Sequence, residues 1–171
     1  ILDLGNHFGV QMTFACVGFA AEPGVFPYHV PEQIRRIYQA GHEIASHSWK
    51  HERFPFLKKD QIVKSLERSK LALETCIQQP GCVTSFVPPF SRPMSWISRG
   101  GFSLGDRAWG PCYPGSDLGS LLKIVHQAGY QWCRVFHRSL WQRLQRESHP
   151  GLQINWNTYH HVECIPQHYT G

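Results

Sequence analysis

The hydrophobic residues of this chain follow a helical spacing in some segments and form short apolar runs in others. Side chains three or four positions apart lie on one face of a helix, so a stripe with this spacing predicts an amphipathic helix. The clearest stripe lies within residues 59–76 and consists of Ile62, Leu66, Ser69, Leu73 and Cys76. Helices are predicted over residues 1–9, 31–41, 59–76, 116–128 and 139–146.

Short apolar runs that are bounded by glycine, proline or polar residues predict the strands. They lie over residues 10–17, 43–46, 83–87, 130–136, 152–156 and 162–165. Because strands and helices alternate with short turns between them, the pattern predicts an α/β fold with a mostly parallel sheet or a barrel of βα units. The chemistry of such folds lies at the carboxyl ends of the strands, so residues just after a strand are the first candidates for a site.

The composition is typical of a single folded domain. The chain has 171 residues, of which 42% are hydrophobic and 17% are charged, and a chain of this length can bury a substantial core. It contains no low-complexity tract and no internal repeat, so we interpret residues 1–171 as one domain. No apolar run approaches the roughly 20 residues of a transmembrane segment, and the sequence shows no export signal.

Charge and cysteine content narrow the classes of function further. The formal net charge is +5, but the basic residues are dispersed along the chain, which does not favour nucleic acid as a partner. The six cysteines include no C-x-x-C pair, so the sequence signals neither a zinc ribbon nor a dense disulfide scaffold. Cys76 and Cys82 are close enough in sequence to bridge a loop, but we expect free thiols.

Two histidines, His47 and His51, directly follow the predicted strand 43–46. Neutral imidazole is a good ligand for zinc and similar ions, and the spacing H-x-x-x-H can direct two rings at one ion if the segment turns helically. Catalysis would need a third ligand and a coordination position left open for water. Spacing alone leaves open the alternative that these are two solvated loop histidines among the eleven of the chain.

The order of the surrounding segments resembles a known family. The resemblance rests on "ILDLGNHFGVQMTFACVG", "AGHEIASHSWKH" and "TSFVPPFSRP", which are similar in sequence and spacing to successive motifs of the polysaccharide deacetylase family, the NodB homology domain. The run from His47 to His51 matches that family's H-[ST]-x-x-H motif. The resemblance is good over residues 1–93 and loose beyond them.

Membership of this family implies a distorted (β/α) barrel and hydrolysis of a carbon–nitrogen amide bond, usually the acetamide of an N-acetylated sugar or polysaccharide. It implies a divalent metal, with zinc expected and cobalt, nickel or manganese as alternatives, held by an aspartate together with His47 and His51. Such an ion polarises the acyl oxygen and acidifies its bound water, from which a carboxylate base takes the proton. Ser48 is expected to brace the loop by hydrogen bonding rather than to act as a nucleophile, or to be a plain turn serine.

The family's base and its metal-binding aspartate form an Asp-Asp pair on a strand before the helix that corresponds to residues 1–9. This sequence contains no such pair ahead of that helix. We therefore expect a domain that is incomplete at its N-terminus, or else a truncated and inactive homologue. Asp3 lies within the helical pattern and is interpreted as a solvated helix residue.

The third segment implies two more catalytic residues. Phe90 belongs to the family's proline-aromatic step, whose backbone N–H helps to hold the oxyanion of the tetrahedral intermediate. The family commonly carries an arginine just before that step, where this chain has Val87. Arg92 is the candidate to supply the missing charge from the other side of the turn, with a surface arginine as the alternative.

The general acid of the family is a late histidine that protonates the leaving amine. His168 follows the predicted strand 162–165 and is the first candidate, with His160 and His161 as alternatives. The expected partner is thus a carbohydrate or a small amide substrate, because the same fold also serves hydrolases of cyclic amides. A non-catalytic carbohydrate-binding homologue is the rival interpretation, and the compartment is left open between cytoplasm and cell envelope.

Overall fold

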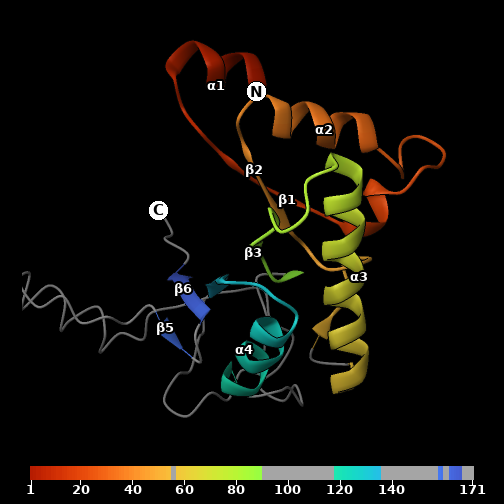
Figure 1. The fold of residues 1–171 in the computed structure, drawn as a ribbon, viewed down its shortest axis with the longest axis vertical. Helices are drawn as coiled ribbons and strands as arrows, with labels where there is room; N and C mark the ends of the chain where they lie inside the picture. Colours follow the sequence, from red (N-terminus) through yellow and green to blue (C-terminus); the bar gives the residue numbers. More distant parts are fainter. Residues whose placement is uncertain (55–56, 90–117, 136–157, 160–161, 167–171) are drawn as a thin grey trace, which may run out of the picture.

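The computed structural model describes residues 1–54, 57–89, 118–135, 158–159 and 162–166 (Figure 1). Within these ranges the helices are α1 (Leu2–Phe8), the 3-10 helix η1 (Gly18–Ala21), α2 (Pro31–Gln39), α3 (Lys59–Ile77) and α4 (Leu118–Gln127). The four α-helices match the helices predicted over residues 1–9, 31–41, 59–76 and 116–128. The predicted helix 139–146 and the predicted strand 152–156 lie outside the described residues.

The described strands form one sheet. They are β1 (Thr13–Cys16), β2 (Glu43–Ser46), β3 (Ser85–Phe86), β4 (Trp132–Val135), β5 (Thr158–Tyr159) and β6 (Val162–Pro166), in the spatial order β1-β2-β3-β4-β6-β5. Every neighbouring pair is parallel except β5 with β6. The predicted mostly parallel sheet is confirmed, and the strand predicted over residues 43–46 has the same bounds in the structure.

Three predicted strands, over residues 10–17, 83–87 and 130–136, begin later in the structure, and in the first and last of them the leading residues serve a helix end instead. The prediction for 10–17 was too long: the backbone N–H of Val10 donates to the carbonyl of Gly5 (2.9 Å), so it closes α1 rather than joining the sheet. In the same way the N–H of Tyr130 donates to Val125 (3.2 Å) at the end of α4. The carbonyl groups at a helix end need hydrogen-bond donors. This requirement outweighs the strand preference of the residues that directly follow the helix.

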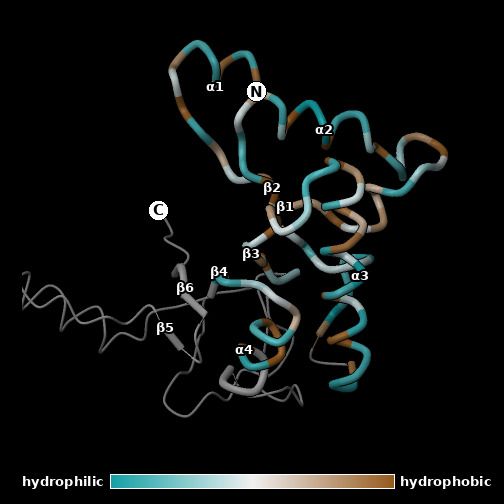
Figure 2. Tube along the Cα trace, in the orientation of Figure 1, coloured by the Kyte–Doolittle hydropathy of each residue, from teal (hydrophilic) through white to brown (hydrophobic). Residues whose placement is uncertain are grey.

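The helices α2, α3 and α4 follow the sheet on one side (Figure 1), and the core lies between. The predicted stripe of α3 is buried throughout, and Leu66 and Leu73 are fully buried. Figure 2 shows hydrophilic and hydrophobic residues alternating along α3, as this half-buried position requires. Asp3 is exposed on α1, as expected for a solvated helix residue.

The two faces of the sheet differ in character because successive side chains of a strand alternate between them. Ser46, Phe86 and Cys133 are fully buried and are paired in register across β2, β3 and β4; the hydroxyl of Ser46 contacts α3, so this row lies on the helix-covered face. On the other face the carboxylate of Glu43 accepts hydrogen bonds from Thr13 and Ser85. The face away from the helices is therefore polar.

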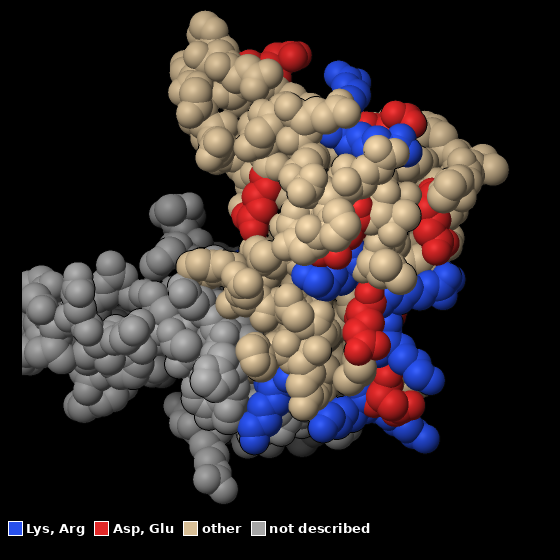
Figure 3. All heavy atoms as spheres, viewed as in Figure 1, with Lys and Arg blue, Asp and Glu red and all other residues tan. Residues whose placement is uncertain are grey.

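Surface charge follows the dispersion seen in the sequence. On the face drawn in Figure 3, lysine and arginine side chains over α3 are interspersed with acidic ones. None of the described helices combines the length and the apolar character needed to cross a lipid bilayer. The cysteines that the structure describes with their side chains, Cys16, Cys76, Cys82 and Cys133, are free thiols, so the expectation for Cys76 and Cys82 is confirmed.

The hydroxyl of Tyr130 gives a test of how α3 is joined to the segment between α4 and β4. Tyr130 is fully buried, and its OH donates to the carbonyl of Leu66 in α3 at 2.9 Å. Burial raises the pKa of this phenol, so it remains a donor at every physiological pH. Tyr130→Phe removes one buried hydrogen bond and should lower the free energy of unfolding by about 1 kcal/mol.

Urea unfolding monitored by circular dichroism measures this loss as a lower midpoint with an unchanged slope. Tyr28→Phe is the matched control, because Tyr28 is 73% exposed and should unfold like the parent chain. Equal midpoints for the two variants would show that the Tyr130 hydroxyl does not join α3 to the segment that precedes β4.

Candidate functional site

The loop after β2 brings the two predicted metal ligands together. The ring centroids of His47 and His51 are 4.8 Å apart, with the ring planes at 66°. Ser48 and His51 both have positive φ angles, 67° and 59°, a region that side-chain-bearing residues seldom adopt. Strained backbone of this kind persists only where the surroundings hold it, and it is frequent at binding and catalytic sites.

One ring nitrogen of His47 is anchored on the neighbouring strand. Its Nδ1 lies 2.6 Å from the carbonyl oxygen of Val87, and a carbonyl oxygen can only accept, so the proton is on Nδ1. The lone pair of Nε2 is then left for another partner, which is the arrangement found in metal-binding histidines. Val87, noted in the sequence for lacking the expected arginine side chain, thus contributes its backbone to the candidate site.

The local electrostatics keep His47 neutral. Burial lowers its pKa, and the neighbouring charges of His51 and Arg134 act in the same direction, while the hydrogen bond to Val87 opposes them. An imidazole that is neutral at pH 7 needs no deprotonation before it binds an ion. The donor set of His47 and His51 therefore fits one side of a divalent metal site.

Serines of α3 hold the loop in this shape. Ser69 donates its hydroxyl to the carbonyl of Ser48 (2.9 Å), and the backbone N–H of Trp49 donates to Ser65 Oγ (3.1 Å). Ser65 and Ser69 are four residues apart and therefore lie on the same face of α3. The hydroxyl of Ser48 itself accepts the N–H of Glu52 (3.3 Å), which is the bracing role expected for this residue.

Glu52 closes the loop from its far end. Its carboxylate accepts hydrogen bonds from Ser65 Oγ (3.1 Å) and from the backbone N–H of Lys50 (2.9 Å). Burial alone would raise the pKa of Glu52, but hydrogen bonds involving Ser48, Lys50 and Ser65 outweigh it and lower the pKa below its ordinary value. Glu52 is therefore an ionised group that braces the loop, and its carboxylate oxygens already accept the hydrogen bonds from Ser65 and Lys50.

The aromatic residue of the motif is a packing residue. Trp49 is 6% exposed, its ring meets the edge of Phe19 at 5.8 Å, and the Arg68 guanidinium lies 3.8 Å from its centroid. Gly18 lets η1 approach α3 at this point, because a Cβ atom there would lie 2.5 Å from the Cα of Ser69. The loop is thus clamped between η1 and α3.

Arg134 is a functional candidate that the sequence reasoning missed. It is half-buried on β4, and it is near enough to His47 for its charge to lower the pKa of that histidine. A charged residue inside the short apolar strand "WCRV", directly after a core cysteine, was the available signal. The position of Arg134 relative to His47 became clear only from the register of β2, β3 and β4.

Other predicted site residues are not brought together by the described structure. Phe90, Arg92 and His168, with the alternatives His160 and His161, lie outside the described residues. Within the described ranges, no three or more side chains of His, Cys, Asp and Glu gather closely enough to hold a metal ion. The predicted ligand pair, His47 and His51, is therefore the part of the site that can be argued from geometry.

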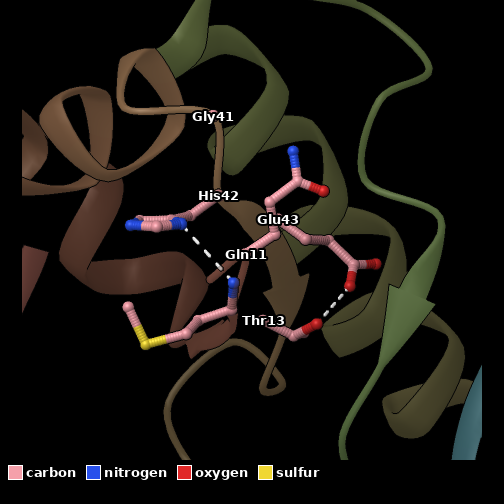
Figure 4. Close-up of a pocket in the computed structure, with 6 residues that line it drawn as sticks. Gln11, Thr13, Gly41, His42 and Glu43 are labelled. Carbon is pink, nitrogen blue, oxygen red and sulfur yellow. Dashed lines mark hydrogen bonds between the residues drawn. The ribbon is translucent and has the colours of Figure 1, made fainter. Parts of the chain in front are cut away.

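A separate pocket of about 300 Å³ lies at the opposite ends of the strands. Figure 4 shows its lining, which comes from the start of β1 and β2 and includes Thr13, His42 and Glu43. The Nδ1 atom of His42 accepts the backbone N–H of Met12 at 3.4 Å, and Nε2 has no hydrogen-bond partner in the structure. Because β1 and β2 run parallel, this pocket and the His47 loop lie at different ends of the sheet.

A parallel sheet with a braced histidine pair at its carboxyl edge defines an α/β protein with a candidate metal-dependent site. Residues 1–98 match the sequence profile of the family Polysaccharide deacetylase. The chain belongs to this family. No curated protein sequence matches it.

Solved structures agree on the fold. A protein from Mycobacterium smegmatis assigned to the polysaccharide deacetylases is 24% identical, with a TM-score of 0.58 over 81% of this chain and 37% of its own. A family 4 carbohydrate esterase from Streptomyces lividans, in complex with acetate, is 17% identical with a TM-score of 0.53, over 98% and 69% of the two chains. A mutant of a pseudoenzyme of the same esterase family, with restored enzymatic activity, is 18% identical with a TM-score of 0.55, over 98% and 49%.

These comparisons confirm the predicted fold class, the distorted (β/α) barrel of the NodB type. The chain spans 37% of the protein from Mycobacterium smegmatis. At these identities the likeness is one of fold, and the role of each residue has to come from the geometry described above.

The clamp on the histidine loop can be tested at Gly18. Gly18→Ala places a methyl group against the backbone of α3, and the resulting overpacking should lower the free energy of unfolding by about 1 to 3 kcal/mol. It should also speed hydrogen exchange of the backbone amide of Phe19, which donates to the loop carbonyl of Trp49, and of the loop amide of Trp49, which donates to Ser65 of α3.

Gly81→Ala is the control for this substitution. Gly81 has a φ of 77° and open space around the new methyl group, so the variant loses stability through backbone strain alone. Faster amide exchange in the loop of Gly81→Ala, or unchanged exchange in that of Gly18→Ala, would contradict the clamp.

Proposed function

We propose that the chain is a metal-dependent hydrolase of carbon–nitrogen amide bonds that deacetylates an N-acetylated sugar or polysaccharide. The observation that carries this proposal is the His47 and His51 pair at the carboxyl edge of a parallel sheet, with Nδ1 of His47 anchored on Val87. Membership of the polysaccharide deacetylase family supports the same reaction class.

His47 and His51 would hold a divalent ion, for which zinc is the first candidate because two neutral imidazoles suit it. When bound, such an ion supplies Lewis acidity and an acidified water molecule. The protein's own contribution is to hold both rings in one orientation. The hydrogen bonds of Ser65 and Ser69 to the loop do this from α3.

Three residues complete the proposal. Phe90 would offer its backbone N–H to the oxyanion of the tetrahedral intermediate, and His168 would protonate the leaving amine. Arg92 would supply positive charge beside the reacting group. These assignments rest on the sequence motifs and are proposed for testing by single substitutions.

Metal binding gives the first test of the ligand pair. Elemental analysis and zinc titration of the purified protein should give about one ion per chain. His47→Ala and His51→Ala should each weaken zinc binding by about a hundredfold or more, since even the loss of a residue that only orients a ligand costs ten- to a hundredfold. The control is His7→Ala, which removes an exposed histidine of α1 and should leave zinc binding unchanged.

Activity gives the second test. Loaded with zinc and supplied with the strand that carries the family's Asp-Asp pair, the protein should release acetate from N-acetylglucosamine oligomers, and His47→Ala should abolish the release. Cyclic amides such as hydantoins are the comparison substrates for the alternative activity on the same fold. Zinc binding and turnover both absent from the parent protein would overturn the proposal in favour of a non-catalytic carbohydrate-binding homologue.

A further inference from the structure

The loop between η1 and α2, residues 22–30, projects from the body of the described structure (Figure 1). Figure 2 shows hydrophobic residues at its tip, where Val25, Phe26 and Tyr28 are 77%, 71% and 73% exposed. Single exposed apolar residues are common on proteins, but three large ones within four positions form a patch, and such patches mark interaction sites. This aromatic loop has no part in the chemistry proposed for His47 and His51.

Hydrogen bonds within the aromatic loop fix its shape. The backbone N–H groups of Tyr28 and His29 both donate to the carbonyl of Val25, at 3.1 and 3.2 Å. The Nδ1 atom of His29 donates to the carbonyl of Glu22 at 3.0 Å, and the turn is tight, because a Cβ atom on Gly24 would lie 2.2 Å from Cδ2 of His29. The backbone of the tip is therefore ordered before any partner arrives, which reduces the conformational entropy lost on binding.

Phe19 of η1 connects the aromatic loop to the histidine loop. The centroid of its ring lies 4.4 Å from that of His29 and 5.8 Å from that of Trp49, and its backbone N–H donates to the carbonyl of Trp49 at 2.9 Å. Trp49 stands between His47 and His51 in the sequence. Because η1 and the histidine loop follow the carboxyl ends of two parallel neighbouring strands, β1 and β2, the aromatic loop belongs to the same edge of the sheet as the candidate metal site.

The size and charge of the aromatic loop narrow the class of its partner. Three side chains supply far less area than a stable protein interface, which takes roughly 800 Å² from each partner. Residues 22–30 include one acidic residue and no lysine or arginine, so the loop lacks the cationic groups that attach proteins to anionic lipid. Carbohydrate fits better, because the C–H face of a pyranose ring is apolar and packs on an aromatic ring while its hydroxyl groups stay in water.

We propose that Phe26 and Tyr28 form a distal carbohydrate-binding subsite, which holds sugar units further along the polymer than the unit that loses its acetyl group. The inference rests on the proposed function and adds a substrate class to it, a polysaccharide rather than a single sugar or a small cyclic amide. A polymer whose reacting unit lies at the histidine loop extends along this edge of the sheet, and the exposed rings bind it by packing against sugar faces.

Binding of an oligosaccharide tests this subsite without any need for turnover. The hexamer of N-acetylglucosamine is titrated into the ¹⁵N-labelled full chain, and binding is followed by NMR. The backbone amide signals of residues 24–29 should shift as the hexamer is added. Phe26→Ala and Tyr28→Ala should each weaken hexamer binding about two- to tenfold, as expected for the loss of one stacking contact. Phe26→Tyr keeps a flat ring and should bind like the parent.

Phe8→Ala and Leu71→Ala are the matched controls, because Phe8 on α1 and Leu71 on α3 are also exposed apolar residues. Both variants should bind the hexamer like the parent. In turnover by the zinc-loaded protein that carries the Asp-Asp strand, Phe26→Ala should raise KM for the hexamer and leave kcat, and KM for the dimer, unchanged. A merely structural role would change the hexamer and the dimer alike.

Failure of the subsite and failure of the proposed function are distinguishable. If the parent binds the hexamer through Phe26 and Tyr28 but no form of the protein releases acetate, the proposed function fails and the subsite stands. If acetate is released and the alanine variants keep the parent's hexamer affinity and KM, or if the hexamer leaves the signals of residues 24–29 unshifted, the subsite is overturned.

A lipid contact is the other outcome that would overturn it. Vesicles of phosphatidylcholine with phosphatidylglycerol are sedimented with the parent chain and with Phe26→Ala. Binding of the parent to these vesicles that Phe26→Ala loses, together with no binding of the hexamer, would assign the aromatic loop to a membrane surface. The carbohydrate subsite predicts that the parent stays in the supernatant.

Discussion

The hydroxyl of Ser69 is the interaction on which the site depends. It is fully buried in the middle of α3, and its single proton goes to the carbonyl of Ser48, so it accepts from Ser46 Oγ at 2.8 Å. One residue of a helix thus joins the end of a core strand to the loop that carries both histidines. A polar group buried in this way is stabilising only because every one of these partners is present.

The close approach of η1 to α3 is the second constraint, and it follows from the hydrogen bonds of Ser69. For a short serine side chain to reach both the strand and the loop, η1 and α3 have to pack tightly, and Gly18 leaves the space for it. Trp49 then fills the remaining volume, with Phe19 and Arg68 against its ring. The strained φ angles of Ser48 and His51 are held by this packing, since an isolated loop would relax to ordinary dihedral angles.

Burial and charge act together on the exposed side of this loop. His47 is partly removed from water and lies within reach of the charge of Arg134, so the neutral ring is favoured. The hydrogen bond to Val87 selects which nitrogen keeps its proton.

The sequence by itself determined the four helices, the strand at 43–46 and the pairing of His47 with His51, because these depend on local periodicity and on a motif within one loop. It also indicated the buried face of α3, including Ser69, but not what that serine does. Phe90, Arg92 and His168 stay predictions from the motifs.

Only the tertiary structure decided the late starts of two predicted strands, the packing role of Trp49 and the place of Arg134. The physical reason is the same in each case. Helix ends took the backbone donors of Val10 and Tyr130, and the register of β2, β3 and β4 set which side chains share a row. Register and burial depend on residues far apart in the chain, so no local pattern contains them.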